Sequence, residues 1–197
     1  MKYISRSIDK TLEEWKESTT HKPLLLRGAR QVGKSSAVRH LGTQFKYFAE
    51  VNFESAKSIA TFFKGDLDVK LISSKISNYI QVPIIPGQTL LFLDEIQACP
   101  EAIMALRFFK EDYPELHVIA AGSLLEFALQ SLPTFGVGRI HSVFMYPMTF
   151  DEFLVAMDMG GLLAMRREAT ATHPLDAPFH DKLVNLCRTY LMVGGMP

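Results

Sequence analysis

The sequence predicts an α/β fold in which helices cover both faces of a parallel β-sheet. The wholly apolar run at 24–26 and the largely apolar run at 89–93 suit strands that are buried on both faces. These runs alternate with helix-length segments through the first 146 residues or so. Such alternation is typical of parallel sheets covered by helices, so we expect a three-layer sandwich.

The first half of the chain supplies its elements in a regular order. Residues 5–17 carry apolar side chains at helical spacing, and the apolar run at 24–26 follows as the first buried strand. A glycine-bearing turn leads into a helix at 34–41. Residues 46–53 alternate apolar and polar side chains and predict a second strand. Residues 55–80 are expected to be helical, with a break at a Gly-Asp pair.

The second half completes the sheet. A loop with two prolines and a glycine precedes a buried strand at 89–93. A helix with proline in its first turn follows at 100–112. Further strands are expected at 117–121 and 139–145.

The stretch from residue 147 onward is expected to be mainly helical. Residues 169–181 hold two prolines and join two helices in this prediction. The helix at 181–193 is amphipathic, so its apolar face must pack on the core or on a partner. That face consists of Leu183, Leu186, Cys187, Tyr190 and Leu191.

Composition and charge narrow the class of protein. The chain has 197 residues, of which 48% are hydrophobic, and this indicates a packed globular core. Lys plus Arg and Asp plus Glu both total 21, so the basic surplus of a protein that coats nucleic acid is missing. Cys99, Cys187 and the six histidines match no metal-ligand spacing. With no signal peptide or membrane-length apolar run in the sequence, we expect a cytoplasmic protein with reduced thiols.

The segment Gly28-Ala29-Arg30-Gln31-Val32-Gly33-Lys34-Ser35 matches the phosphate-binding pattern G-x-x-x-x-G-K-[ST] at every fixed position. Its glycines let backbone N–H groups approach phosphate oxygens, and the helix that follows points its positive end at the anion. The lysine supplies charge to the β- and γ-phosphates, and the serine hydroxyl is a hard ligand for Mg²⁺. The expected nucleotide-binding residues are Gly28, Ala29, Arg30, Gln31, Val32, Gly33, Lys34, Ser35 and Ser36.

Two carboxylates follow the apolar strand at 89–93. In phosphate-binding folds of this kind, the first carboxylate, here Asp94, holds Mg²⁺ directly or through water. Glu95 is then placed to polarise an attacking water as a general base. Like charges repel, so a chemical role explains why these two carboxylates are adjacent better than chance does.

Two further residues are candidates for contact with the γ-phosphate. Ser123 follows the strand at 117–121 and would sense or orient the attacking water if that strand lies beside the Asp94 strand. Alternatively, Ser123 caps a helix, with Glu126 completing a capping box. Arg139, after Gly136-Val137-Gly138, would stabilise charge in the transition state, or be an exposed loop arginine or the partner of a carboxylate.

Several segments together resemble the predicted ATPases of the AAA+ superfamily, on the branch related to archaeal ATPases. The resembling segments lie at residues 24–35, 90–97, 117–127, 138–153 and 191–197. The resemblance implies five parallel strands, a helical lid, and nucleotide-site roles for Lys34, Ser35, Asp94, Glu95 and Ser123. It leaves open whether Arg139 serves its own site or that of a neighbouring copy.

The resemblance also divides the chain. Residues 1–146 correspond to the AAA+-type ATPase core. Residues 147–197 correspond to a helical lid and the start of a truncated C-terminal region, because such proteins continue beyond the point where this chain stops.

The sequence therefore favours an ATPase or ATP-driven switch that uses ATP and Mg²⁺. A small-molecule kinase and a nucleotide-dependent binding module with little hydrolysis remain alternatives. No Asn-Lys-x-Asp element is present to read guanine, which favours ATP. A homo-oligomer, a missing C-terminal domain or protein partner, and DNA are open as partners, although the neutral net charge does not support DNA. The sequence does not assign the adenine contacts; the segment just before Leu24 and the lid after Pro147 are the natural places to look for them.

Overall fold

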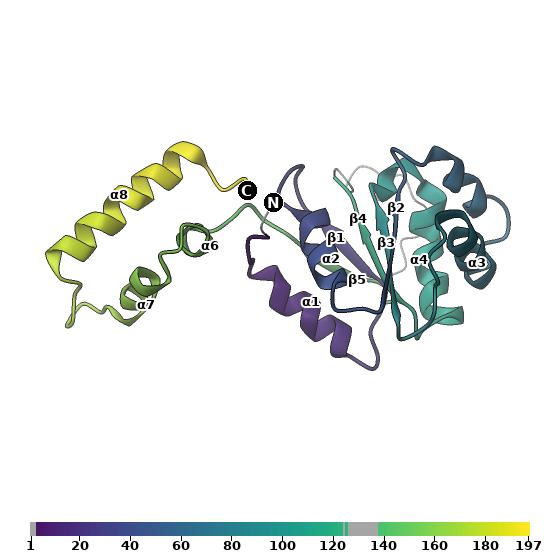
Figure 1. Cartoon of the computed structure of the whole chain (residues 1–197), viewed down its shortest axis with the longest axis horizontal. Coiled ribbons are helices and arrows are strands. Elements are labelled where there is room, and N and C mark those ends of the chain that lie inside the picture. The colour runs from purple at the N-terminus through teal and green to yellow at the C-terminus, as the bar shows by residue number, and fades with distance from the viewer. Residues whose placement is uncertain (1–2, 124, 126–137) are drawn as a thin grey trace.

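The computed structural model describes residues 3–123, 125 and 138–197. These residues contain one sheet of five parallel strands in the order β2-β3-β4-β1-β5 (Figure 1). The strands are β1 (Leu24–Arg27), β2 (Tyr47–Asn52), β3 (Thr89–Asp94), β4 (His117–Ala121) and β5 (His141–Phe144). The predicted five-stranded parallel sheet is confirmed.

Helices cover both faces of this sheet, which confirms the predicted three layers. One face carries α1 (Ile8–Glu17) and α2 (Lys34–Gly42), and the other carries η1 (Lys57–Phe63), α3 (Val69–Ile80) and α4 (Pro100–Asp112). Successive residues of a strand point to opposite faces. Accordingly, Leu24 and Leu26 of β1 pack with α1 and α2, whereas Leu25 packs with the α3 and α4 side.

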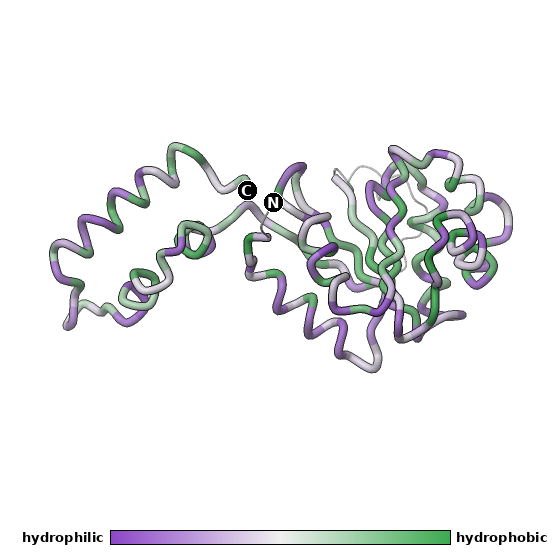
Figure 2. Tube along the Cα trace, viewed as in Figure 1, coloured by the Kyte–Doolittle hydropathy of each residue, from purple (hydrophilic) through white to green (hydrophobic). Residues whose placement is uncertain are grey.

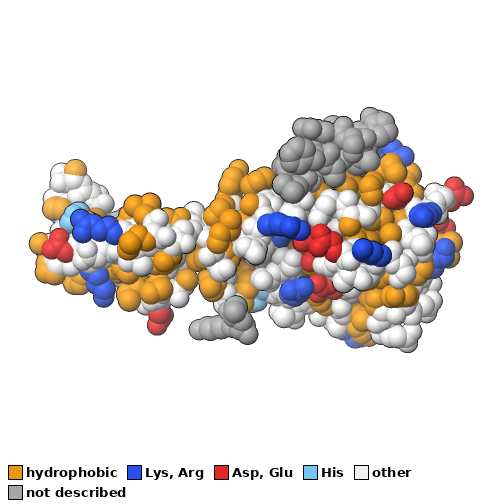
Figure 3. Space-filling model, turned by 90° about the horizontal axis from the view of Figure 1, so that it is seen from above, with side chains coloured by type: hydrophobic (Ala, Val, Ile, Leu, Met, Phe, Trp, Pro, Cys, Tyr) orange, Lys and Arg blue, Asp and Glu red, His pale blue; other side chains and the backbone are white. Residues whose placement is uncertain are grey.

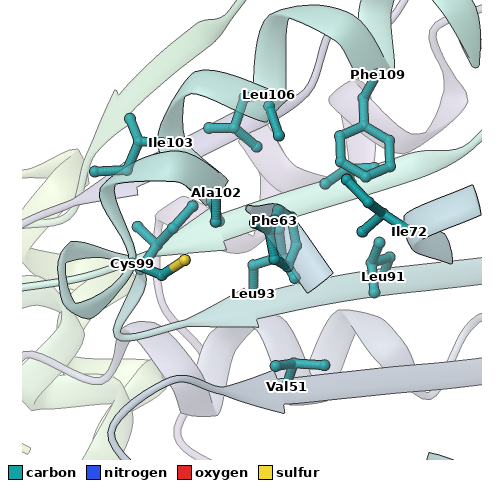
Figure 4. Packing of buried hydrophobic residues seen from close by; sticks show 14 of the residues in the cluster. Val51, Phe63, Ile72, Leu91, Leu93, Cys99, Ala102, Ile103, Leu106 and Phe109 are labelled. Atoms are coloured by element: carbon teal, nitrogen blue, oxygen red, sulfur yellow. The ribbon is translucent and has the colours of Figure 1, made fainter. Parts of the chain in front are cut away.

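The core on the α3 and α4 side is built from aliphatic and aromatic side chains. Leu91 and Leu93 of β3 lie in one cluster with Leu106 and Phe109 of α4, and all four side chains are almost wholly buried (Figure 4). The roughly 25 cal/mol gained per Å² of apolar surface buried is the main favourable term holding this layer to the sheet.

The helical stretch expected at 55–80 is divided close to the predicted break. Its first part, η1, is a 3-10 helix, and α3 begins only after Asp68. The Asp68 carboxylate accepts hydrogen bonds from the backbone N–H groups of Lys70 and Leu71, which satisfies two donors that a helix start leaves unpaired. Gly65 between the two helices has φ of 84°, a conformation that glycine adopts at little cost.

A small helical lobe follows the sheet and extends away from it (Figure 1). It consists of α6 (Phe150–Ala156), α7 (Gly160–Glu168) and α8 (Ala177–Val193) around a cluster of buried leucines. The α6 start has a capping box, in which Thr149 and Glu152 bond each other's backbone N–H groups. After α8 the chain returns to the lobe's entrance, where the Gly195 carbonyl accepts from Met148 N at 2.6 Å.

The last helix differs from its expected form. It begins at Ala177 rather than near residue 181, because Pro178 lies in its first turn, where the missing N–H has no partner to lose. Hydrophilic and hydrophobic residues alternate along α8 (Figure 2). Leu183 packs in the lobe, but Leu191 is 74% exposed, so the chain itself leaves part of the predicted apolar face uncovered. In the described part of the chain, no helix is long and apolar enough to cross a membrane.

Candidate functional site

The loop between β1 and α2 has the backbone that a phosphate-binding loop requires. Gly28 has φ of 143° and Gly33 has φ of 99°, both in the region that side chains disfavour. A Cβ at Gly28 would lie 2.2 Å from the carbonyl oxygen of Met145, so only glycine fits there. Gln31 also has a positive φ, of 62°. This loop therefore turns tightly and leads directly into the N-terminus of α2.

Lys34 folds back onto its own loop. Its Nζ donates to the carbonyl oxygens of Gly28, at 2.9 Å, and Ala29, at 2.8 Å. Burial lowers the pKa of Lys34, while the nearby carboxylates of Glu95 and Asp94 favour its charged form. The loop thus holds a buried ammonium group beside two carboxylates.

Ser35 and Asp94 meet at the carboxyl edge of the sheet. Ser35 Oγ donates to Asp94 Oδ2 at 2.9 Å, and the backbone N–H of Glu95 donates to Asp94 Oδ1 at 3.0 Å. Burial raises the pKa of Asp94, and these two hydrogen bonds oppose the rise. A hydroxyl and a carboxylate are hard oxygen ligands that Mg²⁺ prefers, so the pair fits the predicted metal role.

Glu95 stands at a sharp bend immediately after β3. Its backbone lies in the left-handed region, with φ of 50°. Its Oε2 accepts a hydrogen bond from Gln97 Nε2 at 2.6 Å. The Glu95 side chain lines the same cavity as Lys34 and Ser35.

Ser123 lies beside Glu95 because of the strand order. β4 pairs with β3 on one side and with β1 on the other, so its carboxyl end falls between the ends of those strands. A sensing role for Ser123 required β4 to lie next to β3, and it does. Ser123 is buried and lines the cavity with Glu95. Glu126, which the capping alternative requires, lies outside the described residues.

The cavity at this edge has a volume of about 750 Å³. The predicted site residues that line it are Arg30, Gln31, Gly33, Lys34, Ser35, Ser36, Glu95 and Ser123. Gly28 and Ala29 contribute the carbonyl groups that hold Lys34, and the Val32 side chain is buried in the core. The structure thus gathers nearly all of the predicted residues around one cavity.

Arg139 is the exception. It lies just before β5, which runs parallel to β1, so it stands at the edge of the sheet opposite the phosphate-binding loop. There it forms an ion pair with Glu111 of α4. Action of Arg139 on the nucleotide of its own chain is therefore contradicted, and the carboxylate-partner alternative describes its place here.

Other cavity residues were missed in the sequence. Tyr3, Ile4, Arg6, His40, Thr43 and Pro197 line the same cavity as Lys34. The rings of Tyr3 and His40 stack with their centroids 4.0 Å apart. No motif marks Tyr3, and the stack appears only when the amino-terminal segment packs against α2.

The segment just before Leu24, one of two places considered for adenine contacts, does not line the cavity around Lys34. Thr20, His21 and Lys22 line a separate cavity of about 450 Å³ together with Ile140 and His141, which lie beside the start of β1. In a parallel sheet, the amino end of β1 is the far end from its phosphate-binding loop. Among the described residues after Pro147, Pro197 is the one that lines the cavity around Lys34.

Arg6 connects the phosphate-binding loop to the helical lobe. Its guanidinium group donates to the carbonyl oxygens of Val32, at 2.8 Å, and Tyr146, at 2.9 Å. It also forms an ion pair with Glu152 of α6, at 3.1 Å, and both side chains are more than nine-tenths buried. Glu152 Oε1 accepts from the Ser7 backbone and hydroxyl groups as well.

The cysteines and the possible metal-binding side chains agree with the sequence. Cys99 and Cys187 are both free, as expected of thiols without a partner spacing. Among the described residues, no three side chains of His, Cys, Asp or Glu are grouped to hold a metal ion. A bound Mg²⁺ would therefore depend on Ser35, Asp94 and the phosphate oxygens of a nucleotide.

Comparison with known proteins agrees with this geometry. The family model described as "AAA domain" matches residues 20–154, from before β1 into α6. No curated protein matches the sequence significantly.

Two solved structures are similar in fold. The structure of the Drosophila ORC bound to DNA has a TM-score of 0.54 at 13% identity, over 94% of this chain and 56% of that chain. The structure of the Aeropyrum pernix ORC1 protein in complex with DNA has a TM-score of 0.48 at 16% identity, over 81% of this chain and 47% of that chain. The chain thus spans about half the length of each, and at such identity the Drosophila match supports the fold alone.

Proposed function

Because the chain belongs to the AAA domain family, whose model matches residues 20–154, we propose that it binds MgATP and hydrolyses it, with Glu95 activating the attacking water. One observation carries the proposal: Lys34, Ser35, Glu95 and Ser123 line a single cavity, with Asp94 hydrogen-bonded to Ser35. Positioning and electrostatic stabilisation are the main tasks of a protein in phosphoryl transfer, and these residues are placed for both.

The roles follow from the contacts. Lys34 and the backbone N–H groups of its loop bind the β- and γ-phosphates, which displace the loop carbonyls from the ammonium group. Ser35 and Asp94 would hold a Mg²⁺ ion, and such an ion would offset negative charge on the phosphate oxygens. Ser123 orients the water from the neighbouring strand.

Glu95 is the general base of this proposal. It takes a proton from water while the water oxygen bonds to the γ-phosphorus. The bond between that phosphorus and the bridging oxygen breaks, and ADP leaves with its electron pair. Phosphate and ADP are the products.

The part of the cavity lined by Tyr3 and His40 suits a nucleobase. The stacked rings of these two residues line the cavity together with Thr43, and aromatic faces bind the flat face of a base. We assign adenine to this part of the cavity because the sequence contains no guanine-reading Asn-Lys-x-Asp element.

The charge distribution of the chain bears on whether it binds DNA as well as nucleotide. Both similar structures were solved with DNA, but on the face of this chain seen in Figure 3, Lys and Arg side chains are interspersed with Asp and Glu. Together with the neutral net charge, this favours nucleotide over DNA as the ligand that the chain binds by itself. A homo-oligomer in which Arg139 reaches a neighbouring site is compatible with its half-exposed position.

Phosphate release from MgATP by the wild-type and Glu95→Gln chains tests the function, with ATP binding followed in parallel. We expect both chains to bind ATP and only the wild type to turn over. The exposed Glu14→Gln variant is the matched control and should hydrolyse at the wild-type rate. Hydrolysis by Glu95→Gln at the wild-type rate would contradict the role of Glu95.

Two other outcomes point to the alternatives. Binding by both chains with turnover in neither indicates a nucleotide-dependent binding module or a site that needs a neighbour. Phosphate found on an added metabolite instead of in solution indicates a kinase.

A further inference from the structure

Gln97 joins the proposed base to the neighbouring strand. It lies in the short 3-10 helix η2 (Ile96–Ala98), two residues after Glu95. The left-handed backbone of Glu95 turns the chain sharply, and the Gln97 amide comes back to donate to Glu95 Oε2 at 2.6 Å. This is the one side chain that donates to the Glu95 carboxylate among the hydrogen bonds of the described residues.

The other end of the Gln97 amide is unusual. Its Oε1 is buried and has no hydrogen-bond partner within the described part of the chain. Leaving a buried carbonyl oxygen unpaired costs free energy, so such groups are rare without a function. The cost shows that stability alone does not explain glutamine at this position.

Gly122 supplies the space for this amide. A Cβ built on Gly122 would lie 2.2 Å from Gln97 Oε1 and 3.3 Å from its Cδ. The Gln97 side chain therefore rests against the backbone of residue 122, directly before Ser123. In this way it spans from Glu95 after β3 to the end of β4.

We infer that Gln97 is a positioning residue that fixes the Glu95 carboxylate for catalysis, and that Gly122 keeps the space in which it does so. The inference rests on the proposed role of Glu95 as base. With Oε2 held by the amide, Oε1 of Glu95 is the oxygen left to accept the proton of water. A neutral donor suits this task, since a lysine would pair with the base and reduce its basicity.

A substitution that keeps volume separates positioning from packing. Gln97→Met removes both the donor and the unpaired oxygen. We expect kcat for ATP hydrolysis to fall by about tenfold to a hundredfold, because a misplaced base loses the geometry of attack. KM and ATP affinity should stay within about twofold and Tm should not fall, because nothing in the phosphate contacts changes and a buried unpaired group is lost.

A double-mutant cycle tests the role of Gly122. Gly122→Ala should lower kcat by displacing the amide, and Gln97→Ala should lower it by removing the amide. If both act through one group, the double variant should be no slower than Gln97→Ala alone. Its Tm should be at least that of Gly122→Ala, since the shortened side chain at position 97 leaves room for the added methyl group.

The contrary results are distinct. An unchanged kcat in Gln97→Met, or a loss of kcat matched by a loss of Tm and ATP affinity, overturns the inference. Independent, multiplying effects of Gly122→Ala and Gln97→Ala overturn it as well.

Failure of the proposed function would look different. A wild-type chain that binds MgATP without releasing phosphate counts against hydrolysis and not against the Gln97 contact. In that case the side-chain amide resonances of Gln97, identified by their loss in Gln97→Met, decide the matter. They should shift in Glu95→Ala, and amide resonances that stay in place overturn the inference.

Discussion

The Ser35 hydroxyl donates to the Asp94 carboxylate, with 2.9 Å between Oγ and Oδ2, although the two residues are 59 positions apart in sequence. The bond joins the first turn of α2 to the end of β3, across the strand β4 that separates β1 from β3. It holds together the two oxygen groups that we propose as ligands of Mg²⁺.

This pair should set the magnesium requirement. Ser35→Ala and Asp94→Asn each remove a ligand or its charge, so the Mg²⁺ concentration needed for half-maximal ATP turnover should rise about tenfold or more, or ~1.4 kcal/mol. A magnesium titration measures the change. The exposed Ser74→Ala variant on α3 is the control. An unaltered magnesium requirement in both site variants would exclude this pair as the metal site.

Lys34 should dominate ATP affinity. Lys34→Met keeps most of the apolar stem but removes the charged donor, and a hydrogen bond to a charged group contributes about 1.5–3 kcal/mol. We therefore expect roughly a tenfold to hundredfold loss of ATP affinity by calorimetry. Lys10→Met, at an exposed position, should bind as the wild type does. Equal affinities of the two variants would remove Lys34 from the phosphate site.

The Arg6–Glu152 ion pair should stabilise the fold strongly. Arg6→Met leaves the Glu152 carboxylate buried without its cation, and breaking a buried pair in this way costs about 3–5 kcal/mol. Urea unfolding measures the loss. Joint replacement of Arg6 and Glu152 by Met should cost less than the two single changes added together. Additive costs would show that the two side chains do not act as a pair.

Glu152 should also make the protein sensitive to acid. Burial alone would raise its pKa, but hydrogen bonds from Ser7 and Thr149 and the contact with Arg6 outweigh burial and lower the pKa to about 2. The folded value lies below the unfolded value of about 4.5, so this stabilisation is complete above about pH 4.5 and is lost as the pH falls toward 2. It amounts to roughly 3 kcal/mol at ~1.4 kcal/mol per pKa unit.

The free energy of unfolding between pH 2 and 6 tests this assignment. Glu152→Gln should remove that part of the acid dependence, whereas exposed Glu14→Gln should keep it. A Glu152→Gln chain with the wild-type pH curve would assign the acid sensitivity elsewhere.

His117 should make the stability of the fold depend on pH in a milder range than Glu152 does. Burial and then the stacked ring of His21 lower the pKa of His117 below its usual 6.5. The folded chain therefore keeps this ring neutral while the unfolded chain takes up a proton, so stability declines as the pH falls below about 6.5. His117→Gln should flatten the unfolding free energy between pH 7 and 5, and the exposed His180→Gln should not. Equal slopes in wild type and His117→Gln would contradict this.

The fold and the phosphate end of the site could be predicted because their signals are local. The glycines, lysine and serine at 28–35 specify one loop backbone, and the apolar runs specify buried strands. The prediction that Ser123 lies near the γ-phosphate depended on β4 lying beside β3, and the sequence alone did not establish that pairing.

The rest depends on how distant segments pack. Tyr3 and Arg6 enter the cavity only because the amino-terminal segment crosses α2 and the loop, and no sequence spacing encodes that approach. Gln97 carries no signal of its own beyond following Glu95. The position of Arg139 depends on the strand pairing. β5 runs parallel to β1, so Arg139, which precedes β5, lies at the end of the sheet opposite the loop that follows β1.

Gly28 places fold and chemistry under one constraint. Its missing side chain lets phosphate approach and also lets the loop lie against the Met145 carbonyl, 2.2 Å from where a Cβ would be. In a survey of all substitutions, variants at Gly28 should therefore fall in cellular abundance as well as activity. Variants at Lys34 should keep their abundance and lose only activity. The two patterns would distinguish Gly28, which the loop backbone requires, from Lys34, which is proposed to bind the phosphate.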